Sequence, residues 1–312
     1  MPSRINPDAL RAQLSPLRHT AELTADARFY QAYYGLDLPH HGGIQRCLGR
    51  FQVHGYEVVA QAWSPEQPVA TLLVLHGYYD HMGLYRHVVD WGLRMGFAVL
   101  ACDLPGHGLS SGPRASINEF EEYQAVLQGL LHEAAAMELP QPWHLLGQST
   151  GAAIVLDYLL CQPVHPALGQ SILLAPLVRP RAWGWSRFSY EVMRRFVKQI
   201  PRRFSENSGD PAFLQFIQSS DPLQPDILPT AWVGALSRWI QRIEGAPASP
   251  HSPLIVQGEA DMTVDWQHNL PVLQDKFAAP EILRLPAARH HLVNEQEALR
   301  REYFGFLSER LK

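Results

Sequence analysis

Apolar and polar residues alternate in blocks along this chain, and the blocks predict a repeating order of strands and helices. Six short runs centred on apolar residues have the length of buried strands: 70–75, 97–102, 143–146, 170–175, 252–257 and 281–285. Longer segments suited to helices stand between or after them: 84–95, 118–138, 152–160, 265–277 and 292–311. Strands joined through helices run parallel with right-handed crossovers. The order therefore predicts an α/β fold with a mostly parallel sheet and helices on both faces.

Three stretches depart from this alternation. The first 45 residues are polar and predict an N-terminal arm (1–45) packed on the main domain. The segment 46–63 alternates around His54-Gly55, which indicates a β-hairpin. A later stretch contains no clear core strand and predicts a helical insertion. The predicted organisation is a core formed by 46–177 and 244–312, with a helical cap at 178–243.

Local signals add detail to two of the helices. Ser116 and Glu119 form an S-x-x-E pattern, which predicts a capping box at the start of the helix at 118–138. In the insertion, residues 186–200 place six apolar side chains on one helical face: Phe188, Val192, Met193, Phe196, Val197 and Ile200.

The same insertion carries a concentration of positive charge. From Arg179 to Arg203 there are eight Lys or Arg residues and one acid, Glu191. One interpretation is a helix packed on the body with a solvated basic face. The other is a lid whose apolar side covers an acyl pocket and whose basic side meets anionic headgroups of a membrane. The sequence is compatible with both.

Composition narrows the class of protein. A chain of 312 residues with 46% hydrophobic content can bury a large core, and one α/β domain with an insertion suits this length. The net charge of −4 argues against nucleic acid as a partner. Three separated cysteines predict a reducing compartment. No apolar signal segment and no run of 18 apolar residues is present, so we predict a cytoplasmic protein that touches at most the inner face of the membrane.

Neighbouring histidines precede a pair of glycines at His40-His41-Gly42-Gly43. No third ligand lies nearby in the sequence, so the pair predicts an ordinary loop rather than a metal site. The chemistry described next needs no metal and no cofactor, and we predict neither.

One apolar strand turns abruptly into a helix at Gly147-Gln148-Ser149-Thr150-Gly151. A strand-to-helix turn this tight leaves no room for a Cβ at Gly147 or Gly151. Ser149 is then held at the apex with its hydroxyl exposed. The helix that follows points N–H groups toward developing negative charge.

Partners for this serine follow other predicted strands. Asp261 comes after the strand at 252–257, and His290 comes after the strand at 281–285. Ligands of open α/β sheets bind beyond the carboxyl ends of the strands, so these side chains should meet. Ser149 would be the nucleophile, His290 the base and Asp261 the carboxylate that orients it.

Competing residues remain for two of these roles. His291 is adjacent to His290 and could be the base. Asp265 and Glu259 compete with Asp261. His107, in a Gly-His-Gly loop, is predicted to be structural.

The oxyanion should be held by two backbone N–H groups. Thr150 is the first residue of the elbow helix, and Tyr78 follows the strand at 70–75 through His76 and Gly77. His76 and Gly77 support this loop, as Gly147 and Gly151 support the elbow.

At these residues the chain resembles the monoacylglycerol lipase and lysophospholipase branch of the α/β-hydrolases, a group also described as serine aminopeptidase-like. The similarity runs from about residue 52 to the end and is carried by His76-Gly77-x-x-Asp80-His81 with Tyr85, Asp103-x-x-Gly106-His107-Gly108-x-Ser110-x-Gly112, Gly147-x-Ser149-x-Gly151, Ala175-Pro176-Leu177, Ser220-Asp221-Pro222-Leu223, Gly258-x-x-Asp261 and Ala288-x-His290-x-x-x-Asn294-Glu295.

The resemblance implies an α/β-hydrolase fold, an eight-stranded sheet and a helical cap inserted after the sixth strand. It also favours His290, since the family's base is the first histidine of the last motif. Three positions depart from the family pattern. Gln148 stands where histidine is frequent, Thr150 where methionine is frequent, and Asp80 where glutamate is usual.

These observations predict a serine carboxylester hydrolase that acts through an acyl-enzyme on a small lipid or ester substrate. The substrate class is single-chain lipid, either monoacylglycerol or lysophospholipid. An amide or peptide hydrolase with the same triad is the alternative. A ligand-binding protein without catalysis is a third hypothesis.

Overall fold

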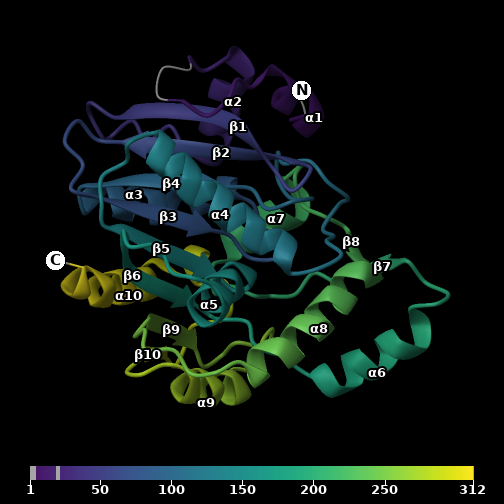
Figure 1. Cartoon of the computed structure of the whole chain (residues 1–312). Coiled ribbons are helices and arrows are strands. Elements are labelled where there is room, and N and C mark those ends of the chain that lie inside the picture. The colour runs from purple at the N-terminus through teal and green to yellow at the C-terminus, as the bar shows by residue number, and fades with distance from the viewer. Residues whose placement is uncertain (1–4, 19–21, 312) are drawn as a thin grey trace.

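The computed structural model describes residues 5–18 and 22–311, and its centre is a twisted eight-stranded sheet (Figure 1). The strand order is β1-β2-β4-β3-β5-β6-β9-β10. The strands are β1 (Gln45–Val53), β2 (Tyr56–Ser64), β3 (Ala70–Leu75), β4 (Phe97–Cys102), β5 (Trp143–Gln148), β6 (Leu168–Leu174), β9 (Leu254–Gly258) and β10 (Glu281–Leu285). The predicted eight-stranded sheet is confirmed.

Pairing is antiparallel at one edge and parallel elsewhere. β1 and β2 form the predicted hairpin, in which His54 and Gly55 both adopt positive φ, and β2 then pairs antiparallel with β4. From β4 to β10 every neighbouring pair is parallel. The register places Leu75 opposite both Cys102 and Gly147, so β3, β4 and β5 end at the same edge of the sheet.

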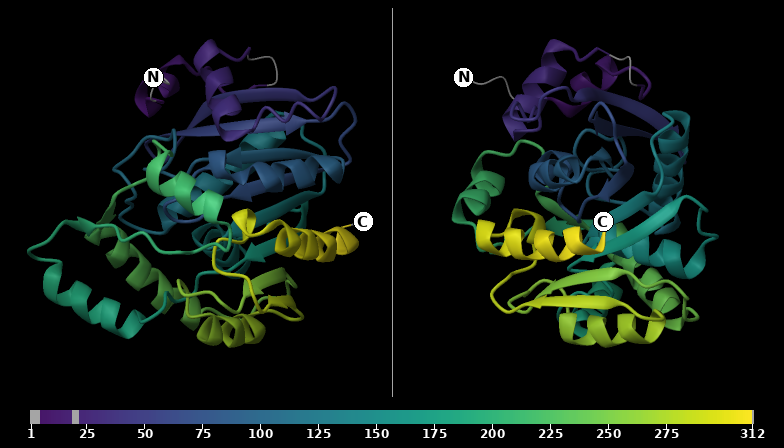
Figure 2. Two further views of the ribbon diagram at one scale, coloured as in Figure 1. Left: turned by 180° about the vertical axis from the view of Figure 1, so that it is seen from behind. Right: turned by 90° about the vertical axis from the view of Figure 1, so that its left-hand side faces the viewer.

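Helices cover both faces of the sheet, as the views in Figures 1 and 2 show. The helices are α1 (Pro7–Gln13), α2 (Ala25–Tyr34), α3 (Arg86–Arg94), α4 (Glu121–Ala136), α5 (Thr150–Cys161), α6 (Trp183–Met193), α7 (Pro211–Ser219), α8 (Thr230–Gly245), α9 (Trp266–Lys276) and α10 (Glu297–Arg310). Two short 3₁₀ helices, η1 (Met82–Tyr85) and η2 (Leu292–Asn294), precede α3 and α10.

The core lies in two layers separated by the sheet. Leu73 and Leu75 face one side of β3, with α4, α5, α8 and α9, whereas Leu72 and Val74 face the other side, with α2, α3 and α10. Successive strand residues point to opposite faces, so a strand covered on both sides is apolar at every position. Complete burial of one such leucine contributes about 1.5–3 kcal/mol relative to exposure.

The start of α4 corrects the predicted capping box. The helix begins at Glu121, after Phe120, rather than at 118. The carboxylate of Glu122 accepts the backbone N–H groups of Asn118 and Glu119. The acceptor is therefore a glutamate inside the first turn, and the segment from Ser116 to Phe120 remains outside the helix.

The segment 178–243, which we call the cap segment, contains α6, α7, most of α8 and a two-stranded sheet of β7 (Gln199–Pro201) and β8 (Ile227–Pro229). The helix predicted at 186–200 ends at Met193, and its last residues form β7 instead. The apolar face predicted to pack is mostly exposed, with Phe188 at 60% and Phe196 at 86%. In Figures 1 and 2, α6 stands away from the sheet.

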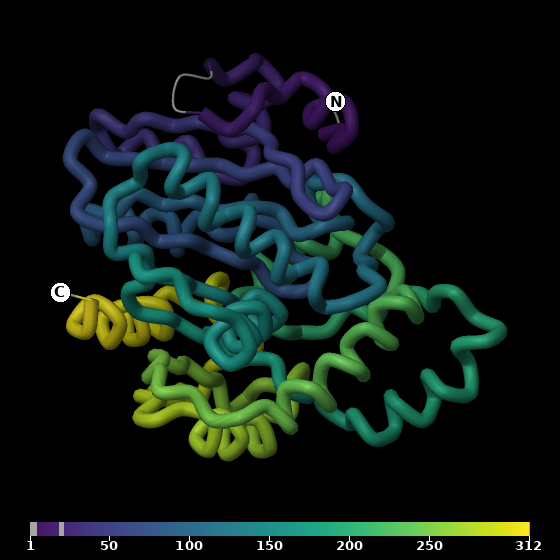
Figure 3. Tube along the Cα trace, viewed as in Figure 1, coloured from purple at the N-terminus to yellow at the C-terminus, as the bar shows by residue number. Residues whose placement is uncertain are grey.

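The predicted arm lies along the β1 edge of the sheet, opposite β10 (Figure 3). Its backbone pairs with β1, because Leu17 N–H donates to the Arg50 carbonyl and Arg50 N–H donates to the Ser15 carbonyl. Farther along the arm, Tyr33 and Tyr34 of α2 contact Phe216 of α7. The arm therefore connects one edge of the sheet with the cap segment.

Candidate active site

The elbow between β5 and α5 is closed by two glycines that other backbone touches directly. A Cβ on Gly147 would lie 2.3 Å from the carbonyl carbon of Gly151, and a Cβ on Gly151 would lie 2.1 Å from the Leu75 carbonyl oxygen. Ser149 between them has φ 54° and ψ −108°, a conformation that non-glycine residues rarely adopt. The turn thus holds the Ser149 side chain at the carboxyl edge of the sheet.

Three of the predicted side chains form one hydrogen-bonded chain. His290 Nε2 lies 2.9 Å from Ser149 Oγ, and His290 Nδ1 lies 2.6 Å from Asp261 Oδ2. All three residues are buried. The anionic carboxylate of Asp261 accepts a hydrogen bond from Nδ1–H of His290, which leaves the Nε2 lone pair directed at the Ser149 hydroxyl. In this arrangement the imidazole can take the serine proton.

Asp261 is held as an anion by its surroundings. Burial raises its pKa, but His290 and the backbone N–H groups of Thr263 and Val264 outweigh burial and leave the pKa below its ordinary value. Both N–H groups donate to Oδ1, while Gln257 donates to Oδ2 beside His290. The carboxylate is therefore fixed in orientation as well as in charge.

The competing residues have other partners in the structure. His291 Nε2 lies 3.0 Å from Asp80 Oδ1. Asp265 caps α9 by accepting the His268 N–H, and Glu259 forms an ion pair with Arg284. The Nδ1 atom of His107 lies 2.9 Å from the Pro105 carbonyl oxygen. The geometry thus places His290 beside Ser149 and Asp261 beside His290, whereas the competing residues contact other groups.

The loop after β3 is anchored from both sides. His76 accepts the Leu104 N–H at Nε2 and donates from Nδ1 to the Gly77 carbonyl, and burial lowers its pKa, so the ring is neutral. The N–H of Gly77 donates to the hydroxyl of Tyr85, which in turn donates to Asp80. A Cβ on Gly77 would come within 3.4 Å of Ser149 Cβ, so the loop lies against the serine.

The two predicted oxyanion donors border this loop and the elbow. Thr150 is the first residue of α5, and its N–H is one of the four at a helix start that have no acceptor within the helix. Tyr78 follows Gly77, and its ring stacks on Trp232 of α8 with centroids 3.7 Å apart. Both residues line the pocket that contains Ser149 and His290.

This pocket has a volume of about 240 Å³ and lies between the sheet edge and the cap segment. Apolar side chains come from both parts: Leu177, Pro180, Ile217, Trp232 and Val264. Arg202, Arg203, Asn207 and Gln224 of the cap segment also line it. The pocket therefore offers an apolar wall and a cationic rim around one hydroxyl.

Sequence reasoning did not give Gln148 or Gln257 a role. Gln148 donates from Nε2 to the carbonyl oxygen of His290 at 2.9 Å, and Gln257 donates to Asp261. Both glutamines are buried at strand ends next to residues already selected. A glutamine at or just after the end of a predicted buried strand, a few residues before a predicted catalytic residue, is the sequence signal that could have identified both.

A second buried pair, also missed from sequence, connects the loop with the cap segment and the arm. His81 Nε2 lies 3.0 Å from Asp221 Oδ2, and the Tyr34 hydroxyl donates to Asp221 Oδ1. Burial raises the pKa of Asp221, but the charge and hydrogen bond of His81 outweigh it and bring that pKa to about 2. The pKa of His81 is raised by Asp221 against the opposing effect of burial.

We expect the Asp221–His81 pair to stabilise the fold most between about pH 4 and 6.5. Asp221 has a folded pKa below its unfolded value, so its contribution is lost as pH falls from about 4 toward 2. His81 has a raised folded pKa, so its contribution is present below about 6.5 and is lost as pH rises through that folded value. The acid-side loss should be about 2 kcal/mol.

Urea unfolding of wild type and Asp221→Asn from pH 3 to pH 9 measures this effect. The difference in unfolding free energy should peak inside the window and shrink on both sides. Two curves that stay parallel across the whole range would show that the pair does not titrate as described.

Comparison with known proteins shows the family to which this chain belongs. The family described as serine aminopeptidase, S33, matches residues 66–297. The chain belongs to this family. The resemblance inferred from the motifs is thereby confirmed.

Several relatives carry lipase or phospholipase names. The monoacylglycerol lipase of Mycolicibacterium smegmatis is 28% identical over 255 residues, which cover 78% of this chain and 90% of that protein. The monoglyceride lipase of Homo sapiens is 24% identical over 272 residues, or 83% of this chain and 85% of that protein. Phospholipase YtpA of Bacillus subtilis is 29% identical over 114 residues, 36% of this chain and 43% of that protein.

Solved structures give the same picture of the fold. A monoglyceride lipase from Saccharomyces cerevisiae superposes with a TM-score of 0.73 at 17% identity, covering 85% of this chain and 94% of that one. The monoacylglycerol lipase of Paleococcus ferrophilus gives a TM-score of 0.68 at 18% identity, covering 84% and 98%. The predicted α/β-hydrolase fold is confirmed, and the family and the relatives together make the chain a serine hydrolase.

Proposed function

We propose that this protein hydrolyses carboxylic esters of single-chain lipids, monoacylglycerols or lysophospholipids, through Ser149, His290 and Asp261. The observation that carries the proposal is the hydrogen-bonded chain from Ser149 Oγ through His290 to Asp261 beside an apolar pocket. The lipase names of the relatives support the lipid substrate.

In the proposed reaction, Ser149 Oγ attacks the ester carbonyl carbon while His290 Nε2 takes its proton. The N–H groups of Tyr78 and Thr150 stabilise the oxyanion, where loss of one such donor typically costs about 10²–10³ in rate. His290 then donates the proton to the leaving alcohol, and the acyl group remains on Ser149. Water, deprotonated by His290, releases the fatty acid and restores the serine.

The pocket suggests which parts of the substrate lie where. Leu177, Ile217 and Trp232 offer an apolar surface to the acyl chain. Arg202 and Arg203 lie on the cap side and favour a polar or phosphate-bearing headgroup. At about 240 Å³ the pocket is smaller than most ligand sites, which supports a single chain over two.

Initial rates on p-nitrophenyl esters of increasing acyl length, monoacylglycerol and lysophosphatidylcholine test the proposal. We expect an optimum at medium or long chains. Activity restricted to acetate and butyrate esters would contradict the lipid assignment. Equal rates on aminoacyl amides and medium-chain esters would favour the amide hydrolase alternative instead.

We also propose that the cap segment contacts anionic membranes. Trp185, Phe188 and Phe196 are 72%, 60% and 86% exposed on or just after α6. Arg195 and Lys198 lie exposed in the same stretch. Exposed aromatic side chains beside basic ones match the composition of surfaces that lie in a membrane interface. Within residues 5–18 and 22–311, no helix has the length and apolarity to cross a bilayer.

Binding to phosphatidylglycerol vesicles at low salt, measured by sedimentation, checks this contact. Replacing Phe188 and Phe196 together by serine should weaken binding at least about tenfold, because each ring loses apolar burial in the interface. Phe29→Ser, which changes an exposed phenylalanine of the arm, is the matched control. Vesicle binding that is absent, or unchanged by the double substitution, would refute the contact.

The cysteines support a reducing, cytoplasmic location, which we propose on their evidence. Cys47, Cys102 and Cys161 are all free thiols, and the first two are buried. Burial raises the pKa of Cys47 to about 11, which keeps that thiol protonated and unreactive.

A further inference from the structure

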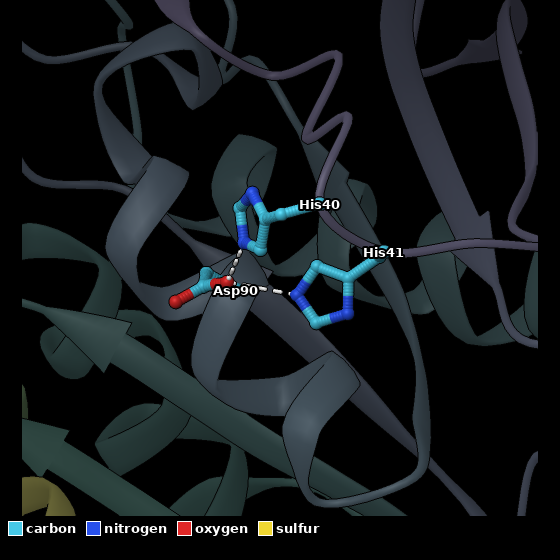
Figure 4. A group of neighbouring side chains, drawn as sticks. All are labelled: His40, His41 and Asp90. Atoms are coloured by element: carbon cyan, nitrogen blue, oxygen red, sulfur yellow. Dashed lines mark hydrogen bonds and ion pairs between the residues drawn. The ribbon is translucent and has the colours of Figure 1, made fainter.

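Three side chains from two separate parts of the chain, the arm and α3, meet near the surface (Figure 4). His40 and His41 lie in the loop between α2 and β1, and Asp90 projects from α3. The Nε2 atoms of His40 and His41 lie 2.7 Å and 2.8 Å from the same oxygen, Asp90 Oδ1. Asp90 is 49 residues from His41, so the sequence pattern alone did not reveal a third ligand.

The three donor atoms lie close enough together to bind one small divalent cation after a small outward shift. They lie within 4.8 Å of one another. A tetrahedral zinc ion with bonds of about 2.0–2.2 Å keeps its ligand atoms roughly 3.3–3.5 Å apart. The two nitrogen–oxygen distances, 2.7 Å and 2.8 Å, therefore need to open by roughly 0.5–0.8 Å. The side chain of His40 is 54% exposed, which leaves access for a water molecule as fourth ligand.

Both the carboxylate and the loop are held before any ion binds. Arg94 Nη2 lies 2.6 Å from Asp90 Oδ2, so the other oxygen is the one that faces the histidines. Such contacts to the non-ligating atom fix the orientation of a metal ligand. The loop is closed by His41 N–H donating to the Leu38 carbonyl, and Leu38 and Gly43 supply the positive φ values of the turn.

We propose that His40, His41 and Asp90 form a zinc site that ties the α2–β1 loop to α3. Two imidazole nitrogens and one carboxylate oxygen favour zinc over magnesium or calcium, which prefer oxygen ligands. None of the three residues lines the pocket around Ser149, so the site is separate from the proposed hydrolytic chemistry. A bound zinc ion should stabilise the attachment of the arm, because it would join the α2–β1 loop, which is part of the arm, to α3, which is part of the core.

Calorimetric titration of zinc into tag-free, EDTA-treated protein tests the site. We expect one ion per chain in wild type and at least a tenfold weaker affinity in Asp90→Asn and in His40→Asn. Saturating zinc should raise the Tm of wild type by about 3 °C and leave both variants unchanged. Magnesium and calcium should produce no shift in any of them.

A matched control separates this site from the other histidines of the chain. His54→Asn changes an exposed histidine in the β1–β2 turn, where asparagine accepts the positive φ, and should bind zinc like wild type. His40→Asn alters a half-exposed side chain, so its metal-free Tm should stay near that of wild type even if Asp90→Asn unfolds. Zinc bound equally by wild type and His40→Asn, or not bound by wild type, would overturn the proposal.

Discussion

Replacing Ser149 by alanine is expected to lower kcat for ester hydrolysis by a factor of about 10⁴–10⁶ while the fold stays intact. The substitution removes Oγ, the atom that attacks the ester carbonyl carbon and carries the acyl group in the proposed mechanism. The oxyanion donors and the pocket remain, so a small residual rate through direct attack by water is expected. Because Ser149 is buried at 8% exposure and its Oγ bonds only His290 among the described residues, little else should change.

The measurement is kcat on a medium-chain p-nitrophenyl ester, together with labelling by a fluorophosphonate probe. Ser219→Ala is the matched control, because Ser219 is exposed on α7 and its hydroxyl, within the described part of the chain, bonds only its neighbours Gln215 and Ser220. A Ser149→Ala enzyme that keeps more than a hundredth of the wild-type kcat would refute Ser149 as nucleophile. Residual labelling in that variant would show that another nucleophile reacts.

Adding His290→Ala to Ser149→Ala should cost little more than either change alone. Groups that act as one unit are strongly non-additive, because the base has no function once its hydroxyl is gone. His291→Gln should behave differently, since His291 bonds Asp80 rather than Ser149. It should reduce kcat less than His290→Ala does, by loosening the loop that carries Tyr78.

The sheet could be predicted from sequence because its strands are buried on both faces. A strand such as β3 or β4 then shows as an unbroken apolar run, and the predicted bounds at 70–75 and 97–102 match the structure. Loops after such strands gather at one edge, so Ser149, Asp261 and His290 could be brought together without coordinates. For these strands the local run of apolar residues is a direct consequence of burial in the final fold, so the run predicts the strand.

Contacts between distant segments could not be predicted in this way. His291 and Asp80 are 211 positions apart, and His81 and Asp221 are 140 apart. Each partner lies in a polar loop that looks solvated in the sequence. Burial and charge pairing arise only when the loop after β3, the cap segment and the C-terminal part of the chain come together.

The cap segment shows a second limit of predicting structure from sequence. Helical periodicity continues from Phe188 to Ile200, yet α6 ends at Met193 and the chain enters β7. β7 is determined by its pairing with β8, where Ile200 lies opposite Leu228, a contact across almost thirty residues of sequence. A periodic pattern indicates which face is apolar but does not say whether anything covers that face, and here much of it remains exposed.

Gly151→Ala should destabilise the fold by more than about 3 kcal/mol, although it adds a single methyl group to a helix. In an ordinary helix the same change stabilises by roughly 0.5–1 kcal/mol. The new Cβ would lie 2.1 Å from the Leu75 carbonyl oxygen and 2.6 Å from its carbon, both backbone atoms. β3 cannot shift away from the added methyl group, because it is hydrogen-bonded to β4 on one side and to β5 on the other.

Gly305→Ala provides the matched control for this steric argument. Gly305 is an exposed helical glycine in α10, and a Cβ there meets no atom within 4 Å. Urea unfolding should show a higher midpoint for Gly305→Ala and a much lower one for Gly151→Ala, with insoluble expression of the latter counting as the same result. If both variants unfold near the wild-type midpoint, the crossing of α5 over β3 is looser than described. The strained Ser149 backbone would then lack the rigid support that the proposed nucleophile requires.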